Sequence, residues 1–157
     1  IYPKLISIWG EWADVDEDGK IALLFTSTIN KENKAIGFFS AQDYFCNDEF
    51  NPFSNEMDVI YLAIPDNENY RVNTISATIA HELTHAITYN QKTYINILEN
   101  KDEVTEDLFL NEGWSHLSEN LCGYGISGGN IDFYKENGFT VSYIRFNIRL
   151  AFHYFES

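Results

Sequence analysis

The stretch His81-Glu82-Leu83-Thr84-His85 decides how the rest of this chain is interpreted. It lies inside an amphipathic run whose apolar residues recur every fourth position and predict a helix over residues 71–91. Two histidines four residues apart lie on one helical face, where both imidazoles can bind the same Zn²⁺ ion. Glu82 stands between them, where its carboxylate can accept a proton from water at the metal. The stretch therefore predicts a helix that carries a zinc site and a general base.

The predicted helix has two different sides. One side is an apolar stripe for the core, made of Ile75, Ile79, Leu83 and Ile87. The other side carries groups that suit a cleft, namely Thr78, His81, Glu82, His85 and Tyr89. A lone histidine on such a helix more often makes hydrogen bonds than binds metal, and the pairing of two histidines with a glutamate is what favours a metal site.

The composition bounds the fold and the partners. With 157 residues, 45% of them hydrophobic, the chain is long enough to bury about two-thirds of its unfolded surface in a single domain over residues 1–157. The 24 acidic side chains against 10 basic ones, a net charge of −14, argue against nucleic acid and anionic membrane surfaces as partners. No apolar run is long enough for a transmembrane segment. Acidity suits a secreted or cell-surface protein, and Ile1 indicates a processed piece.

An acidic run lies near the start of the chain. Asp14, Asp16 and Asp18, followed by Gly19, match the first half of a calcium-binding loop, so Ca²⁺ is one reading of this run. The twelfth position of such a loop needs a glutamate, but here it is Phe25, inside a strand pattern. We favour an Asp-rich turn whose side chains accept hydrogen bonds from local amides.

The remaining patterns predict an α+β fold. Three apolar runs, at residues 21–26, 36–40 and 57–64, read as strands of a small mixed β-sheet packed on the motif helix. Residues 1–12 read as a helix tail or an irregular lead-in, and residues 92–103 as a polar connection with a short turn of helix. A second helix opens near residue 105, after acidic residues that suit its N-terminus. Strands and loops thus dominate residues 1–70, and helices dominate residues 71–157.

A catalytic zinc needs a third protein ligand from outside the motif helix. Glu112 is the first choice, because it follows an apolar run on the second helix and precedes Gly113, which would allow close approach to a neighbouring helix. His116 and Glu119 are the alternatives on the same helix.

Cys46 and Cys122 are compatible with one disulfide, but free buried thiols are the favoured reading.

Two motifs together carry a resemblance to a known family. His81-Glu-Leu-Thr-His85, followed by Asn111-Glu112-Gly113-Trp-Ser, resembles the gluzincin metallopeptidases and, among them, is most similar to the hyicolysin-like secreted peptidases. The similarity covers residues from about 10 to 125. It implies a zincin-like fold, with a second helical lobe that carries the third zinc ligand. It also implies His81, His85 and Glu112 as ligands, Glu82 as the catalytic base, and zinc-dependent endopeptidase activity on polypeptides.

The sequence departs from that family in three places. The 26 residues between His85 and Glu112 are more than in thermolysin-like relatives. Four residues after the ligand glutamate, where those relatives have an aspartate that orients a zinc histidine, this chain has His116, so Glu119 is a candidate substitute. No motif marks the group that stabilises the transition state, for which Tyr124, Tyr143 and His153 are candidates.

These departures motivate a competing hypothesis from another class. A binding or adhesin-like module could keep the zinc scaffold without cleaving peptides, although such a module has no chemical need for Glu82. If the chain is a peptidase, its substrate is expected to lie extended beside an edge strand, for which residues 36–40 are the candidate.

Overall fold

The elements of the fold are defined by a computed structural model that describes residues 1–66, 70–102 and 104–125. In chain order they are α1 (Tyr2–Trp9), β1 (Ala22–Thr26), α2 (Ser27–Glu32), β2 (Gly37–Phe39), the 3₁₀ turn η1 (Ala41–Tyr44), β3 (Val59–Ala63), α3 (Val72–Tyr89), the π-helical segment η2 (Asn90–Tyr94), α4 (Ile95–Leu98) and α5 (Leu108–Leu121). The three predicted strands and the two predicted long helices are confirmed, each within a few residues of its expected ends. The fold is α+β and is compatible with a zincin-like arrangement.

The three strands form one mixed sheet in the order β1-β3-β2. β1 pairs with β3 in parallel, with Ala22 opposite Val59, and β2 pairs with β3 in antiparallel fashion, with Gly37 opposite Leu62. β2 is therefore an edge strand, as expected for residues 36–40. Between β1 and β2 the chain forms α2, whose first turn is capped by the hydroxyl oxygen of Thr26, which accepts a hydrogen bond from the Thr28 amide.

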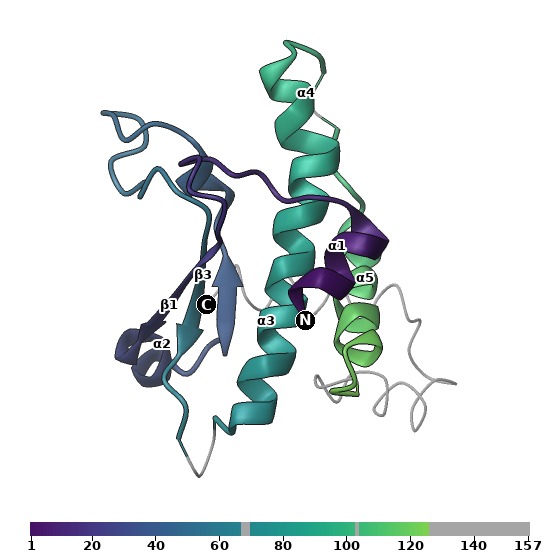
Figure 1. Ribbon diagram of the computed structural model, residues 1–157. Helices are drawn as coiled ribbons and strands as arrows, with labels where there is room; N and C mark the ends of the chain where they lie inside the picture. The colour runs from purple at the N-terminus through teal and green to yellow at the C-terminus, as the bar shows by residue number, and fades with distance from the viewer. Residues whose placement is uncertain (67–69, 103, 126–157) are drawn as a thin grey trace, which may run out of the picture.

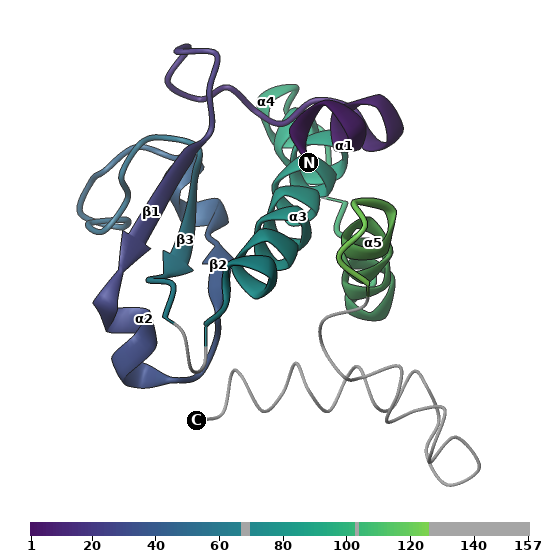
Figure 2. The ribbon, with the colours of Figure 1, turned by 60° about the horizontal axis from the view of Figure 1, so that its bottom comes forward.

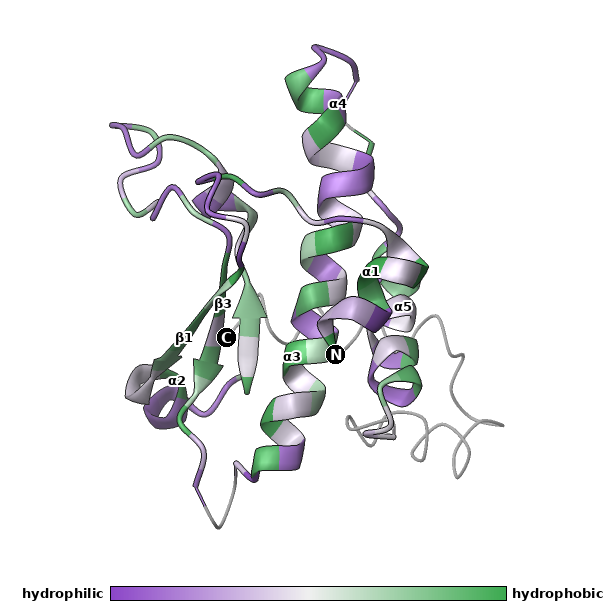
Figure 3. Cartoon of the chain, in the orientation of Figure 1, coloured by the Kyte–Doolittle hydropathy of each residue, from purple (hydrophilic) through white to green (hydrophobic). Residues whose placement is uncertain are grey.

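The long helix α3 runs through the middle of the molecule. The sheet lies on one side of it, and α1 and α5 lie on the other, as both ribbon views show (Figures 1 and 2). Apolar residues follow β1, β3 and α3 (Figure 3). The main core includes the fully or almost fully buried side chains of Leu5, Ile60, Leu62, Leu83 and Ile87. Packing on both sides therefore fixes α3 relative to the sheet and to α5.

The helical rod is longer than the sequence predicted. Residues 92–103 were expected to be mainly a polar connection, but α3 continues without a break through η2 into α4 and ends near Leu98. The side-chain amide of Asn90 donates to the carbonyl of Glu11 at 2.9 Å, and the Thr93 hydroxyl donates to the carbonyl of Val104 at 2.8 Å. These long-range bonds hold polar residues in helical conformation, and local sequence carries no signal of them. Among the described helices, none has the length and apolar character that crossing a bilayer requires.

The acidic run near residue 16 forms a turn, as favoured from the sequence. Asp14 accepts a hydrogen bond from the Gly19 amide at 3.0 Å, and Asp16 and Asp18 accept bonds from the amides two residues further on. The three exposed carboxylates also lie within 4.8 Å of one another.

The two cysteines are free, but Cys46 is exposed, so the expectation that both thiols are buried is wrong for that residue.

Candidate metal centre

The predicted metal ligands meet between α3 and α5. His81 and His85 are one helical turn apart on α3, and Glu112 comes from the second turn of α5. The Nε2 atom of His81 lies 3.3 Å from one carboxylate oxygen of Glu112, and the Nε2 atom of His85 lies 3.6 Å from the other. The histidine side chains are largely buried, whereas the Glu112 side chain is 31% exposed. Two imidazoles and one carboxylate therefore converge at a place that solvent can reach.

The opposite ring nitrogens of the two histidines are held by other side chains. The Nδ1 atom of His81 lies 2.7 Å from Glu119 Oε1, so Glu119 occupies the orienting position expected of a substitute carboxylate. The Nδ1 atom of His85 lies 3.1 Å from Asn111 Oδ1 and 3.2 Å from Ser115 Oγ. An Nδ1–H that donates to such an acceptor leaves Nε2 with its lone pair available. In both rings, therefore, the nitrogen that faces Glu112 is the one suited to bind metal.

His116 adds a second, overlapping donor set. One nitrogen each of His81 and His116 and one oxygen of Glu112 lie within 4.8 Å of one another. However, the Nδ1 atom of His116 lies 3.0 Å from Glu119 Oε1, the same oxygen that contacts His81. The Glu119 carboxylate is almost fully buried and joins the two histidines. Among the described residues, the set with His116, and not the set with His85, has all of its donor atoms this close together, although the residue types in both sets suit zinc, since both combine imidazole nitrogen with carboxylate oxygen.

The electrostatics of the cluster favour a cation. Burial lowers the pKa of His81, but the hydrogen bonds of its ring to Glu112 and Glu119, together with the charge of Glu82, raise that pKa from 6.5 to about 10. Burial also disfavours the charged form of Glu112, yet its contact with His81 and the charges of the surrounding histidines leave its pKa below the ordinary value. The carboxylates thus hold a proton on His81, and a metal ion that binds there must release protons.

Glu82 points toward the sheet. Its side chain is buried, and its Oε2 atom accepts a hydrogen bond of 3.0 Å from the backbone amide of Phe39 in β2. The candidate base is therefore held between α3, which carries it, and the edge strand.

Sequence reasoning missed some of these contacts. Asn111 belongs to the motif that suggested Glu112, but its bond to His85 crosses from α5 to α3 and has no local signature. The hydrogen bond from the Phe39 amide to Glu82 likewise joins β2 to α3 and has no local signature in the sequence. One interpretation was wrong: a Cβ on Gly113 would meet no atom within 4 Å among the described residues, so this glycine does not serve a close helix approach.

The candidates for transition-state stabilisation have different positions. Tyr124 is half-buried just beyond α5, and its amide donates to the carbonyl of Glu119 at 3.1 Å. Tyr143 and His153 lie outside the described residues.

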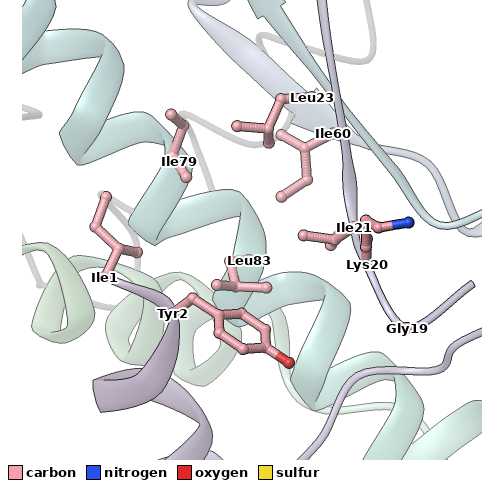
Figure 4. Close-up of a pocket in the computed structure, with 9 residues that line it drawn as sticks. All are labelled: Ile1, Tyr2, Gly19, Lys20, Ile21, Leu23, Ile60, Ile79 and Leu83. Atoms are coloured by element: carbon pink, nitrogen blue, oxygen red, sulfur yellow. The ribbon is translucent and has the colours of Figure 1, made fainter.

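One pocket in the described part of the chain lies away from this cluster. It is bordered by β1, β3, α1 and α3, and its walls are mainly apolar (Figure 4). Ile79 and Leu83 line it from α3. Each precedes a motif histidine by two residues, which is about 200° around the helix, so the pocket opens on the other side of α3.

Fold and site together define an α+β protein with a His- and Glu-rich candidate metal centre between two helices. The chain is similar to a protein described as "Neutral metalloprotease ShpI" from Staphylococcus hyicus. It is 28% identical over 143 residues, covering 87% of this chain and 32% of the relative, so this chain spans about a third of the relative's length. No family model matches the sequence, and no solved structure matches it.

Proposed function

We propose that this chain carries the catalytic centre of a zinc-dependent endopeptidase of gluzincin type, with His81, His85 and Glu112 as ligands and Glu82 as the general base. The observation that carries the proposal is the approach of both Nε2 atoms to the two oxygens of one carboxylate, at 3.3 and 3.6 Å. The similarity to a protein named as a metalloprotease supports the same reaction class. The substrate would be a polypeptide.

Each residue of the cluster has a task in the proposed reaction. Zinc bound there would supply Lewis-acid chemistry, polarising the scissile carbonyl and lowering the pKa of water to about 7. Glu82 accepts the proton of that water and returns it to the leaving amine, as a general base and then a general acid. Glu119 and Asn111 keep the rings of His81 and His85 in the tautomer that presents Nε2.

The edge strand gives the substrate a place to lie. In an antiparallel pair, residues alternate between those that bond to the partner strand and those that point outward. The amide of Ala63 donates to the carbonyl of Ile36 at 2.8 Å, so Ile36 and Phe38 face β3, and Gly37 and Phe39 face outward. An extended peptide beside β2 would meet the outward groups of Gly37 and the carbonyl of Phe39 next to Glu82, because the Phe39 amide already donates to Glu82.

Glu82→Gln tests the proposal. The amide keeps the size of the carboxylate but cannot accept the proton, so the variant should bind zinc as the parent does while its cleavage of casein falls by at least about 100-fold. Elemental analysis measures the zinc, and Glu32→Gln, at an exposed position on α2, is the matched control. Casein cleavage by Glu82→Gln at the parent rate would show that the assigned base is wrong.

The same measurements address the competing hypothesis of a non-catalytic binding module. If the folded parent protein binds zinc and cleaves neither casein nor a mixed peptide library, the binding module replaces the peptidase. An extracytoplasmic location, and Ca²⁺ at Asp14, Asp16 and Asp18, stay predictions from the sequence.

A further inference from the structure

We infer that the backbone amide of Phe39 is a positioning group for Glu82, so that the edge strand β2 sets the direction of the general base. The inference rests on the proposed function, because it assigns a role to a contact of the proposed base. Phe39 lies 43 residues before Glu82, and its N–H donates to Glu82 Oε2 at 3.0 Å. Because Glu82 is only 8% exposed, this bond forms largely out of water and is correspondingly strong.

The amide of Phe39 is available for this task because the sheet does not use it. The strand pairing places Phe39 opposite Ile60 at an outward-facing position of β2. Its N–H therefore points away from β3 and would face solvent or substrate if Glu82 were absent. The hydrogen bond to Glu82 thus adds a link between strand and helix without removing one from the sheet.

The close approach of β2 to α3 depends on Gly37. A Cβ at Gly37 would lie 2.7 Å from the carbonyl oxygen of Tyr61 and 2.8 Å from Cγ2 of Thr78, closer than atoms can pack. Thr78 is one helical turn before Glu82, and Gly37 is two residues before Phe39. These steps are similar in length, about 6.0 Å along a helix and about 6.6 Å along a strand. Two successive contacts therefore hold β2 along α3: the first is between Gly37 and Thr78, and the second is between Phe39 and Glu82.

The consequence for catalysis concerns the direction of the carboxylate. A glutamate side chain has several rotamers, and only some bring an oxygen to a water molecule at the metal. An amide bond to Oε2 selects one orientation and keeps Oε1 for proton transfer. Misplacing a reacting group by about 1 Å can cost roughly 100-fold in rate, so this selection should affect kcat strongly.

Replacing Phe39 tests the role of its amide. Phe39→Pro removes the N–H, and proline is tolerated on edge strands where the N–H does not join the ladder. Phe39→Ala is the matched control, because both variants lose the aromatic ring that contacts Tyr44 and Tyr89, but only the alanine keeps the N–H. We expect Phe39→Pro to have a kcat at least about tenfold below that of Phe39→Ala, with equal zinc affinity. Equal kcat values in two folded variants would overturn the inference.

A double-mutant comparison separates positioning from general damage. If the loss of the N–H acts through Glu82, Phe39→Pro and Phe39→Ala should give the same residual kcat when each is added to Glu82→Gln, because the base is already lost and both lack the ring. If the proline variant stays as far below the alanine variant in the Glu82→Gln background as it does in the parent, the N–H acts elsewhere and the positioning role is wrong.

The bond can also be observed without altering the strand. Phe38-Phe39 is the only pair of adjacent phenylalanines in the chain, so labelling with [¹³C′]Phe and [¹⁵N]Phe selects the Phe39 amide in an NMR spectrum. We expect its proton to resonate downfield in the parent and to move upfield in Glu82→Gln, where the acceptor loses its charge. An unchanged resonance would contradict the contact. This readout does not depend on peptide cleavage, so failure of the inference and failure of the proposed function are distinguishable.

Discussion

At the scale of single residues, Glu119 has the most unusual environment in the cluster. It is 1% exposed, and one of its oxygens contacts both His81 and His116, at 2.7 and 3.0 Å. A carboxylate that deep in a protein needs charged or hydrogen-bonding partners, and here two imidazoles provide them. Its place seven residues after Glu112, two helical turns, keeps both acids on the same side of α5. Glu119 is therefore placed to fix the ring of His81 with its Nε2 atom toward Glu112.

Glu119→Gln should weaken zinc binding. The neutral amide accepts a hydrogen bond from His81 less strongly, so Nε2 becomes a poorer and less fixed ligand, and we expect the zinc affinity to fall by about 10–100-fold. Competition with a chromophoric chelator measures this affinity. Glu99→Gln, at an exposed position after α4, is the control and should bind zinc as the parent does. Parent-like affinity in Glu119→Gln would contradict the orienting role.

His85 and His116 should differ as ligands although both lie near Glu112. The Nε2 atom of His85 faces a Glu112 oxygen at 3.6 Å, whereas His116 is bonded through Nδ1 to the buried Glu119. We therefore expect His85→Phe to lose zinc on dialysis and His116→Phe to retain most of it, with elemental analysis as the measurement. The reverse order would assign the metal to His81, Glu112 and His116.

At the scale of elements, the periodicity of apolar residues in the sequence predicted where the main helices and strands lie. The recurrence of isoleucine or leucine at every fourth position predicted α3. Ile75, Leu83 and Ile87 are buried as expected, whereas Ile79 is only half-buried and lines the pocket. Short apolar runs predicted the strands. The order β1-β3-β2 and the length of the rod from α3 to α4 could not be derived, because they depend on contacts between distant residues such as Asn90 and Glu11. For the same reason, the sequence did not predict the hydrogen-bond partners of His85 and Glu82, which lie on other elements.

The contact between β2 and α3 makes a prediction about stability. Gly37→Ala places a methyl group 2.7 Å from a backbone oxygen of β3, which cannot move without disturbing the sheet, and overpacking of this kind costs about 1–3 kcal/mol. Urea denaturation measures the free energy of unfolding. Gly113→Ala is the matched control: its Cβ meets no described atom within 4 Å, and alanine favours the helix, so it should be neutral or stabilising by up to about 1 kcal/mol. Equal effects of the two substitutions would show that β2 can move away from α3 freely.

At the scale of the whole molecule, α3 lies between two parts that differ in how they pack against it, the sheet and α5. One side of the helix packs on the three-stranded sheet and the other on α5. Apolar side chains hold the first contact. The second contains a cluster of buried polar groups, with Ser115, His116, Ser118 and Glu119 all on α5. Such a cluster is stable only when its hydrogen bonds are satisfied. A metal ion bound by residues of both α3 and α5 would therefore strengthen the α3–α5 interface, which has the smaller share of apolar packing.

Removing zinc should consequently lower the melting temperature. A ligand that binds only the native state stabilises it by about 2.7 kcal/mol at a free concentration of 100 times Kd. At about 2–4 °C per kcal/mol for a chain of this size, Tm should fall by roughly 5–11 °C when a chelator removes the metal. Calorimetry with and without EDTA measures the shift. Glu82→Gln, which keeps all proposed ligands, should show the parent shift, whereas His85→Phe should show a much smaller one. If EDTA leaves the Tm of the parent unchanged while zinc is lost, the metal does not join α3 to α5, and the ligand assignment across the two helices is wrong.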